Sequence, residues 1–133
     1  MLFPIIGRRL HGWLDDVVAL LYLVGIFGLP LHGAARAIGL AGAAVHFLLT
    51  RFTDYPQGTW KRIPFRVHAY IELMEGLGVL VATAALLGAH AQAAPIFLGF
   101  MGLSQLGAFA FSDYGPPAPA LTSPPPRGHR PRA

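Results

Sequence analysis

The chain has 133 residues, of which 54% are hydrophobic and only 12% are charged, and its mean hydropathy is +0.53. Soluble domains carry about 25% charged residues, so this composition indicates an integral membrane protein of one domain. The absence of cysteine excludes disulfides, iron–sulfur clusters and thiolate catalysis. We attribute the net charge of +4 to membrane orientation rather than to nucleic-acid binding, because no soluble fold is left to present a basic face.

Four apolar segments follow one another along the chain, each long enough to cross a bilayer core of about 30 Å. The connections after the first and third segments are short, which predicts two helical hairpins in tandem, and Pro30 ends the first helix. The fold class expected is therefore all-α, an integral membrane four-helix bundle formed by residues 1–114. The Pro-rich residues 115–133 predict a disordered cytoplasmic tail. The predicted helices span about 10–29, 34–50, 67–87 and 94–111.

Lysine and arginine residues collect on one side of the predicted bundle. Nine of the ten lie before the first helix, between the second and third helices, or in the tail, and Arg36 lies on the other side. By the positive-inside rule, this distribution predicts a multi-pass protein of the bacterial inner membrane with cytoplasmic N and C termini. The nine residues are Arg8, Arg9, Arg51, Lys61, Arg62, Arg66, Arg127, Arg130 and Arg132.

The two hairpins share their polar residues. An offset of 57 aligns the starts of the first and third helices, and an offset of 59 aligns the ends of the second and fourth. We predict two copies of one hairpin, at about 8–55 and 64–114, with the same orientation in the membrane. The aligned pairs are His11 with His68, Asp15 with Glu72, His46 with Gln105, and Phe-Thr-Asp-Tyr at 52–55 with Phe-Ser-Asp-Tyr at 111–114.

These landmarks carry a family resemblance. A histidine four residues before an acid opens a helix, Thr-Asp-Tyr closes the next, and Ile-Pro-Phe-Arg-Val-His at 63–68 opens the second copy. Over residues 4–114 the chain resembles the small bacterial membrane proteins with SPW repeats, although the Ser-Pro-Trp triplet itself does not occur. The resemblance implies a four-helix membrane protein of two hairpins and no particular activity.

Histidine and acidic side chains enter the predicted bundle from its cytoplasmic side. Residues four apart share a helix face, so each histidine at a helix start stacks on an acid one turn later. Glu75 lies deeper, and His46 reaches the same depth, which predicts a hydrogen bond from Glu75 to His46, to Gln105 or to intervening water. The predicted polar cluster comprises His11, Asp15, His46, Asp54, His68, Glu72, Glu75, Gln105 and Asp113.

A structural role accounts for this cluster without any ligand. Helix dipoles stabilise carboxylates near helix starts, and the two histidines can hydrogen-bond across the hairpins, His11 to Asp113 and His68 to Asp54. Aromatic residues near the cytoplasmic surface are expected to form a belt at the lipid headgroups. This belt would consist of Trp13, Tyr55, Tyr70 and Tyr114.

Three functional alternatives stay open beside the structural role. His11 and His68 could bind one metal ion or one haem from opposite sides, with carboxylates completing or orienting the shell. Glu75 and His46 could form a proton or ion relay. The bundle could also dock onto a larger membrane complex through stripes of small residues. These stripes are Ala35, Gly39 and Ala43 on the second helix and Gly99, Gly102 and Gly107 on the fourth.

No group of residues suits catalysis. Ser104, Ser112 and Ser123 lack a nucleophile context, and the glycine-rich stretch at 39–46 follows no strand, so it is no phosphate loop. The sequence therefore favours a non-enzymatic structural or accessory membrane protein without a cofactor. Its partners would be the lipid bilayer and either further copies of itself or a larger membrane complex. The alternative is a His/carboxylate site for a metal ion or haem, or an ion relay.

Overall fold

A computed structural model of the chain describes residues 5–87 and 93–115. The prediction of an all-α four-helix bundle is confirmed, and each predicted helix end lies within two residues of the observed one. The tail predicted over 115–133 lies, from residue 116 on, outside the described residues. The helices are α1 (Arg8–Gly28), α2 (Gly33–Phe52), α3 (Phe65–Leu86) and α4 (Ala93–Phe111).

The helix ends follow from proline and glycine at particular positions. α1 ends two residues before Pro30, which cannot donate the backbone hydrogen bond that would continue the helix. α2 begins at Gly33, whose φ of 52° lies in the left-handed region that glycine adopts without a Cβ clash. Pro64 precedes α3 as its N-cap, with a φ of −57° and a ψ of 141°, and the N–H that proline lacks is not needed there because it would have no acceptor within the helix.

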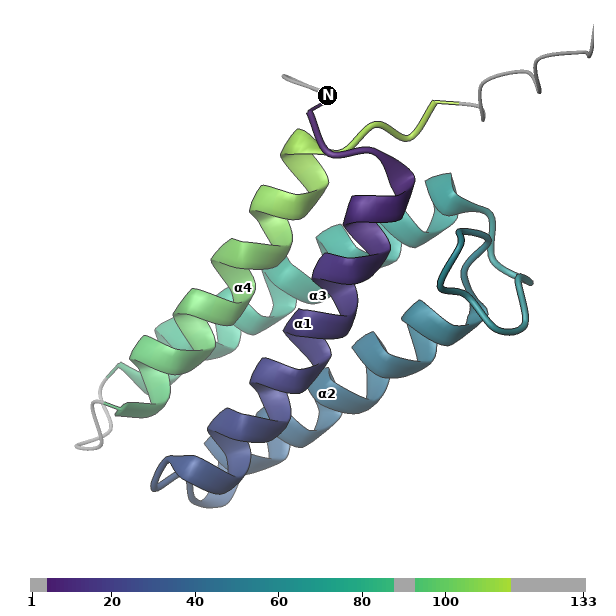
Figure 1. Cartoon of the computed structure of the whole chain (residues 1–133). Coiled ribbons are helices and arrows are strands. Elements are labelled where there is room, and N and C mark those ends of the chain that lie inside the picture. Colours follow the sequence, from purple (N-terminus) through teal and green to yellow (C-terminus); the bar gives the residue numbers. More distant parts are fainter. Residues whose placement is uncertain (1–4, 88–92, 116–133) are drawn as a thin grey trace, which may run out of the picture.

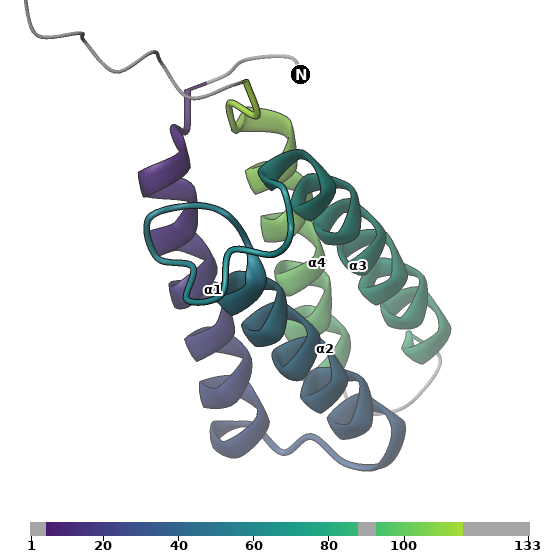
Figure 2. The same cartoon turned by 90° about the vertical axis from the view of Figure 1, so that its right-hand side faces the viewer.

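The helices form two antiparallel hairpins that lie side by side. α1 packs along α2, and α3 packs along α4, as Figures 1 and 2 show. The connection at 53–64 joins α2 to α3 and lies alongside the first half of α1 (Figure 2). Short parallel bridges join chain segments near the helix ends on this side, one between Ile6 and Ser112 and one between Thr53 and Ile63. The chain segments before α1 and after α4 are thereby held together.

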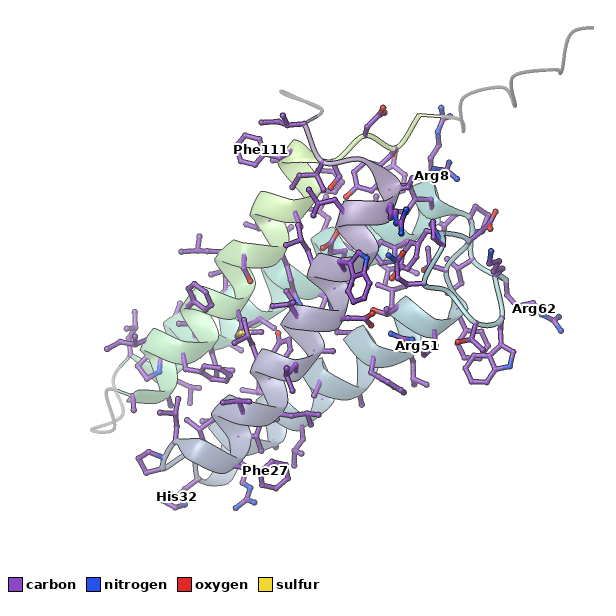
Figure 3. All side chains as sticks on the ribbon, viewed as in Figure 1. Arg8, Phe27, His32, Arg51, Arg62 and Phe111 are labelled. Atoms are coloured by element: carbon purple, nitrogen blue, oxygen red, sulfur yellow. The ribbon has the colours of Figure 1, made fainter. Side chains whose placement is uncertain are left out.

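Charged and apolar side chains separate along the bundle. Arg8 and Arg62 lie at the end formed by the 53–64 connection, whereas Phe27 and His32 lie at the opposite end (Figure 3). The four helices have 19–22 residues, so each is long and apolar enough to cross a membrane. Only 22–39% of the most apolar stretch of each helix is buried inside the bundle, and the outward apolar surface fits a multi-pass membrane protein.

The interior is arranged in three layers along the bundle axis. An aromatic layer lies under the 53–64 connection, a polar layer follows, and apolar side chains fill the half that faces Phe27 and His32. The aromatic layer consists of Tyr55, Phe65, Ala69 and Tyr114. The apolar half contains two packed groups, Val18, Tyr22, Ile26, Ala43 and Met101 in one, and Leu31, Ala35, Val79, Ala94 and Leu98 in the other.

Small residues bring the helices into close contact inside the bundle. At the crossing of α3 and α4, a Cβ atom added to Gly102 would lie 3.0 Å from the carbonyl oxygen of Gly76. The second-helix stripe of Ala35, Gly39 and Ala43 is buried within the bundle. This stripe therefore packs helices of the chain against one another and does not face a partner.

Candidate functional site

Four acidic and histidine side chains meet in the polar layer. His11 and Asp15 come from the first two turns of α1, and His68 and Glu72 occupy the same turns of α3. In each helix the spacing of four residues places both side chains on the inner face. All four side chains are at most 1% exposed, although these residue types are seldom fully buried.

The ligand atoms of these side chains lie close to one another. The Nε2 atoms of His11 and His68 are 3.0 Å apart, on the line where the two hairpins meet. The Asp15 carboxylate lies 3.3 Å from each of these nitrogens. The Glu72 carboxylate lies 3.6 Å from His11 Nε2 and 3.9 Å from His68 Nε2. One atom from each of the four residues falls within a group no wider than 4.8 Å.

Each of the two imidazole rings is held from behind by a hydroxyl group. His11 Nδ1 lies 2.6 Å from Ser112 Oγ, and His68 Nδ1 lies 2.8 Å from Thr53 Oγ1. Because the Thr53 hydroxyl already donates to the Leu49 carbonyl at 2.7 Å, its oxygen accepts from His68 Nδ1. A neutral His68 ring consequently turns the lone pair of Nε2 toward His11 and the two carboxylates.

The two carboxylates are held by buried tyrosines in the same manner. Tyr55 donates to Asp15 at 2.7 Å, and Tyr114 donates to Glu72 at 3.3 Å. Burial, followed by the negative charge of the neighbouring acid, raises the pKa of both tyrosine hydroxyls above the ordinary 10.0. Both hydroxyls therefore keep their protons and act as donors.

Two predicted members of the polar cluster, Asp54 and Asp113, lie outside it. Both side chains are exposed, and Asp113 accepts a hydrogen bond from the backbone of Gly115. The cause is local geometry: side chains alternate along an extended segment, so an aspartate between two inward residues points outward. In the part of the chain that the structure describes, the expected hydrogen bonds from His11 to Asp113 and from His68 to Asp54 are therefore absent. His11 contacts Ser112 and His68 contacts Thr53, the residues that precede those aspartates.

Because of the same alternation, two of the four residues predicted to form the aromatic belt are buried instead. Tyr55 and Tyr114 are 2% and 1% exposed, and they lie over the polar layer inside the bundle. Trp13 and Tyr70 are 58% and 66% exposed, which is the exposure that residues of a headgroup belt require.

A second group of polar side chains continues the layer toward the apolar half. Glu75 lies 3.3 Å from His46 Nδ1, the contact that the depth calculation predicted. The Gln105 amide nitrogen lies 3.4 Å from the same His46 nitrogen and 3.3 Å from the Tyr22 hydroxyl. Among the described residues, His46 Nε2, Glu75 Oε1 and Gln105 Oε1 are buried without a hydrogen-bond partner.

The four-residue group matches the dimensions of a metal site. Four ligands at about 2.1 Å around one ion form a tetrahedron with edges of about 3.4 Å. The five separations measured above run from 3.0 to 3.9 Å, with Asp15 Oδ1 near His11 and Asp15 Oδ2 near His68, and one ligand atom from each residue lies within 4.8 Å of the others. Two carboxylates would also balance the charge of a divalent cation. Within the described part of the chain, neither Asp15 nor Glu72 forms an ion pair with arginine or lysine.

The geometry disfavours haem. Two axial imidazoles on one iron place their nitrogens about 4 Å apart, twice a metal–nitrogen bond of about 2 Å, with the flat macrocycle between them. His11 and His68 meet at 3.0 Å, and Asp15 occupies the space beside both rings. A haem would need the two hairpins to separate.

Comparisons with family models, curated proteins and solved structures find no match for this chain. The resemblance to proteins with SPW repeats therefore stays a prediction, and function is argued from the site.

Proposed function

We propose that this protein binds one divalent transition-metal ion inside the membrane, through His11, Asp15, His68 and Glu72. The observation that carries the proposal is the gathering of four buried ligand atoms, from α1 and α3, within 4.8 Å of one another. Imidazole and carboxylate donors without thiolate suit Zn²⁺, Fe²⁺ or Mn²⁺ rather than Cu⁺. The hydroxyl groups behind each ligand support the proposal, because metal-binding histidines usually donate their second nitrogen to an oxygen.

The charge of the site supports the same proposal. Two carboxylates buried a few ångströms apart repel each other and lose hydration, so they need positive charge nearby. A divalent ion supplies that charge and lets both Nε2 lone pairs point at one centre. The competing explanation is structural: protons held on the imidazoles would bridge the same groups.

The test is metal binding by the whole protein in mild detergent. After treatment with a chelator and its removal, Zn²⁺, Co²⁺ or Mn²⁺ is added separately, and bound metal is counted by mass spectrometry and calorimetry. We expect one ion per chain with at least one of these metals. A wild-type protein that folds in detergent and retains none of them would overturn the proposal.

Matched variants locate the ion. His68→Gln should lower the affinity, whereas His32→Gln, the same change at an exposed histidine, should leave it unchanged. Glu72→Gln keeps the size of the side chain and the acceptor for Tyr114, so it tests the charge if His68→Gln fails to fold. Equal affinities for Glu72→Gln and the wild type would contradict the proposed ligand set.

We also infer that the two hairpins are copies of one unit. Three kinds of contact support this inference, because each occurs twice, the second time with the two halves exchanged. They are the Nδ1–hydroxyl bond and the parallel bridge, which join the halves, and the tyrosine–carboxylate bond, which lies within each half. The bacterial inner membrane, cytoplasmic termini and an accessory role in a larger complex stay predictions, as do a homo-oligomer and an ion relay.

A further inference from the structure

His46 has the features of a metal ligand, although it lies outside the group of four residues described above. Its side chain is fully buried, and its Nε2 atom has no hydrogen-bond partner among the described residues. That nitrogen lies 3.8 Å from Asp15 Oδ1, too far for a hydrogen bond. Two ligands of one ion can be up to about 4.2 Å apart, twice a bond of about 2.1 Å, so the separation suits a shared ion.

Glu75 gives the His46 ring the orientation that metal binding requires. Its carboxylate lies 3.3 Å from His46 Nδ1, and a carboxylate is a stronger acceptor than the amide of Gln105 is a donor. Nδ1 therefore carries the hydrogen, and Nε2 keeps its lone pair. His11 and His68 show the same arrangement, with a hydroxyl oxygen in place of the carboxylate.

The two residues are also polar side chains that the other half of the sequence lacks at the aligned position. The offset of 59 pairs His46 with Gln105, and the offset of 57 pairs Glu75 with Val18. The second half therefore has no equivalent of the histidine, and the first half has no equivalent of the acid. These two departures from the alignment contact each other in the structure.

We infer that His46 is a third imidazole ligand of the ion and that Glu75 is its positioning residue, which rests on the proposed function above. The ion is then five-coordinate, bound by His11, His46 and His68 with Asp15 and Glu72. His46 lies outside the group of four that fits within 4.8 Å, so its ring moves toward the ion on binding. The three imidazoles favour a transition metal over Mg²⁺ or Ca²⁺.

Cobalt provides the readout, because Co²⁺ bound to four ligands absorbs visible light more strongly than Co²⁺ bound to five. Co²⁺ is added to the metal-free wild type and to the metal-free His46→Gln variant. The variant gives position 46 the residue type of its aligned position, Gln105. We expect one Co²⁺ per chain in both proteins, and a stronger visible band in the variant. Proton NMR of the Co²⁺ forms should show three shifted imidazole N–H signals in the wild type and two in His46→Gln.

Glu75→Leu tests the positioning role, and His32→Gln is the control. Loss of an outer partner of a metal-bound histidine typically lowers affinity about 10–100-fold, and we expect Glu75→Leu to lower Co²⁺ affinity within that range, whereas Glu75→Gln keeps an acceptor for His46 Nδ1 and should lower it less. His32→Gln should change neither the spectrum nor the affinity.

The outcomes separate this inference from the proposed function. Identical Co²⁺ spectra and two imidazole N–H signals in both the wild type and His46→Gln would overturn the role of His46 alone. Two Co²⁺ ions per wild-type chain and one in His46→Gln would also overturn it, because His46 would then belong to a separate site. No bound Co²⁺, Zn²⁺ or Mn²⁺ in the folded wild type would overturn both.

Discussion

Replacing either buried tyrosine by phenylalanine removes one hydroxyl and leaves the rest of the ring in place. Tyr55 donates to Asp15 at 2.7 Å, the most favourable length for an O–H donor, whereas Tyr114 donates to Glu72 at 3.3 Å. A hydrogen bond to a charged group contributes about 1.5–3 kcal/mol, and an ordinary one contributes about 0.5–1.5 kcal/mol. We therefore expect Tyr55→Phe to lower the free energy of unfolding of the metal-free protein by about 1.5–3 kcal/mol and Tyr114→Phe by less than about 1.5 kcal/mol.

The measurement is reversible unfolding in mixed detergent micelles, followed by far-UV circular dichroism with a chelator present. The two variants control for each other, because both tyrosines are buried and both contact an acid one turn after a histidine. A larger loss for Tyr114→Phe would refute the link from hydrogen-bond length to stability. Losses below about 0.5 kcal/mol in both variants would show that neither carboxylate depends on its tyrosine.

Three further predictions concern other parts of the bundle. Glu75→Leu leaves His46 Nδ1 without its carboxylate partner and should destabilise the metal-free bundle by about 1–3 kcal/mol. Glu75→Gln keeps an acceptor and should destabilise the bundle less. Equal and negligible losses for both variants in the same unfolding assay would contradict this prediction. Gly102→Ala puts a methyl group 3.0 Å from the Gly76 carbonyl oxygen and should lower the free energy of unfolding by about 1–3 kcal/mol. The control is Gly78→Ala, whose methyl group would meet nothing within 4 Å and should be neutral or stabilising. A neutral Gly102→Ala would mean that α3 and α4 can separate freely. A reporter enzyme fused after Tyr114 should be active in the cytoplasm, since the basic residues collect at that end, and activity in the periplasm alone would reverse the predicted orientation.

The helices could be predicted from hydropathy because spans of about 20 apolar residues have few alternatives in a membrane. The depth of His46 and Glu75 could be predicted for a related reason, since a regular helix converts residue number into depth at a fixed 1.5 Å. Both predictions concern regular helices, in which the residue number determines how far along the helix axis a residue lies.

The hydroxyl and tyrosine partners could not be predicted in the same way, because they lie where the helices end. Tyr55 points inward only because the chain is extended there, and a helix continued by one more turn would have turned Asp54 inward instead. The signal was present in the sequence as Thr-Asp-Tyr and Ser-Asp-Tyr, in which alternate residues are polar donors. To infer from this pattern which side chains point inward, one must know which residue ends the helix, and hydropathy does not locate helix ends that accurately.

The meeting of His11 and His68 at the line between the hairpins has a consequence for biogenesis. Each hairpin inserts into the bilayer with one histidine and one acid of the four-residue group, and neither hairpin can complete that group alone. Until the hairpins dock, these groups face lipid, where a charge is costly, or water. Docking therefore completes the four-residue group, and a chain whose hairpins stayed apart would leave its histidines and acids without their partners.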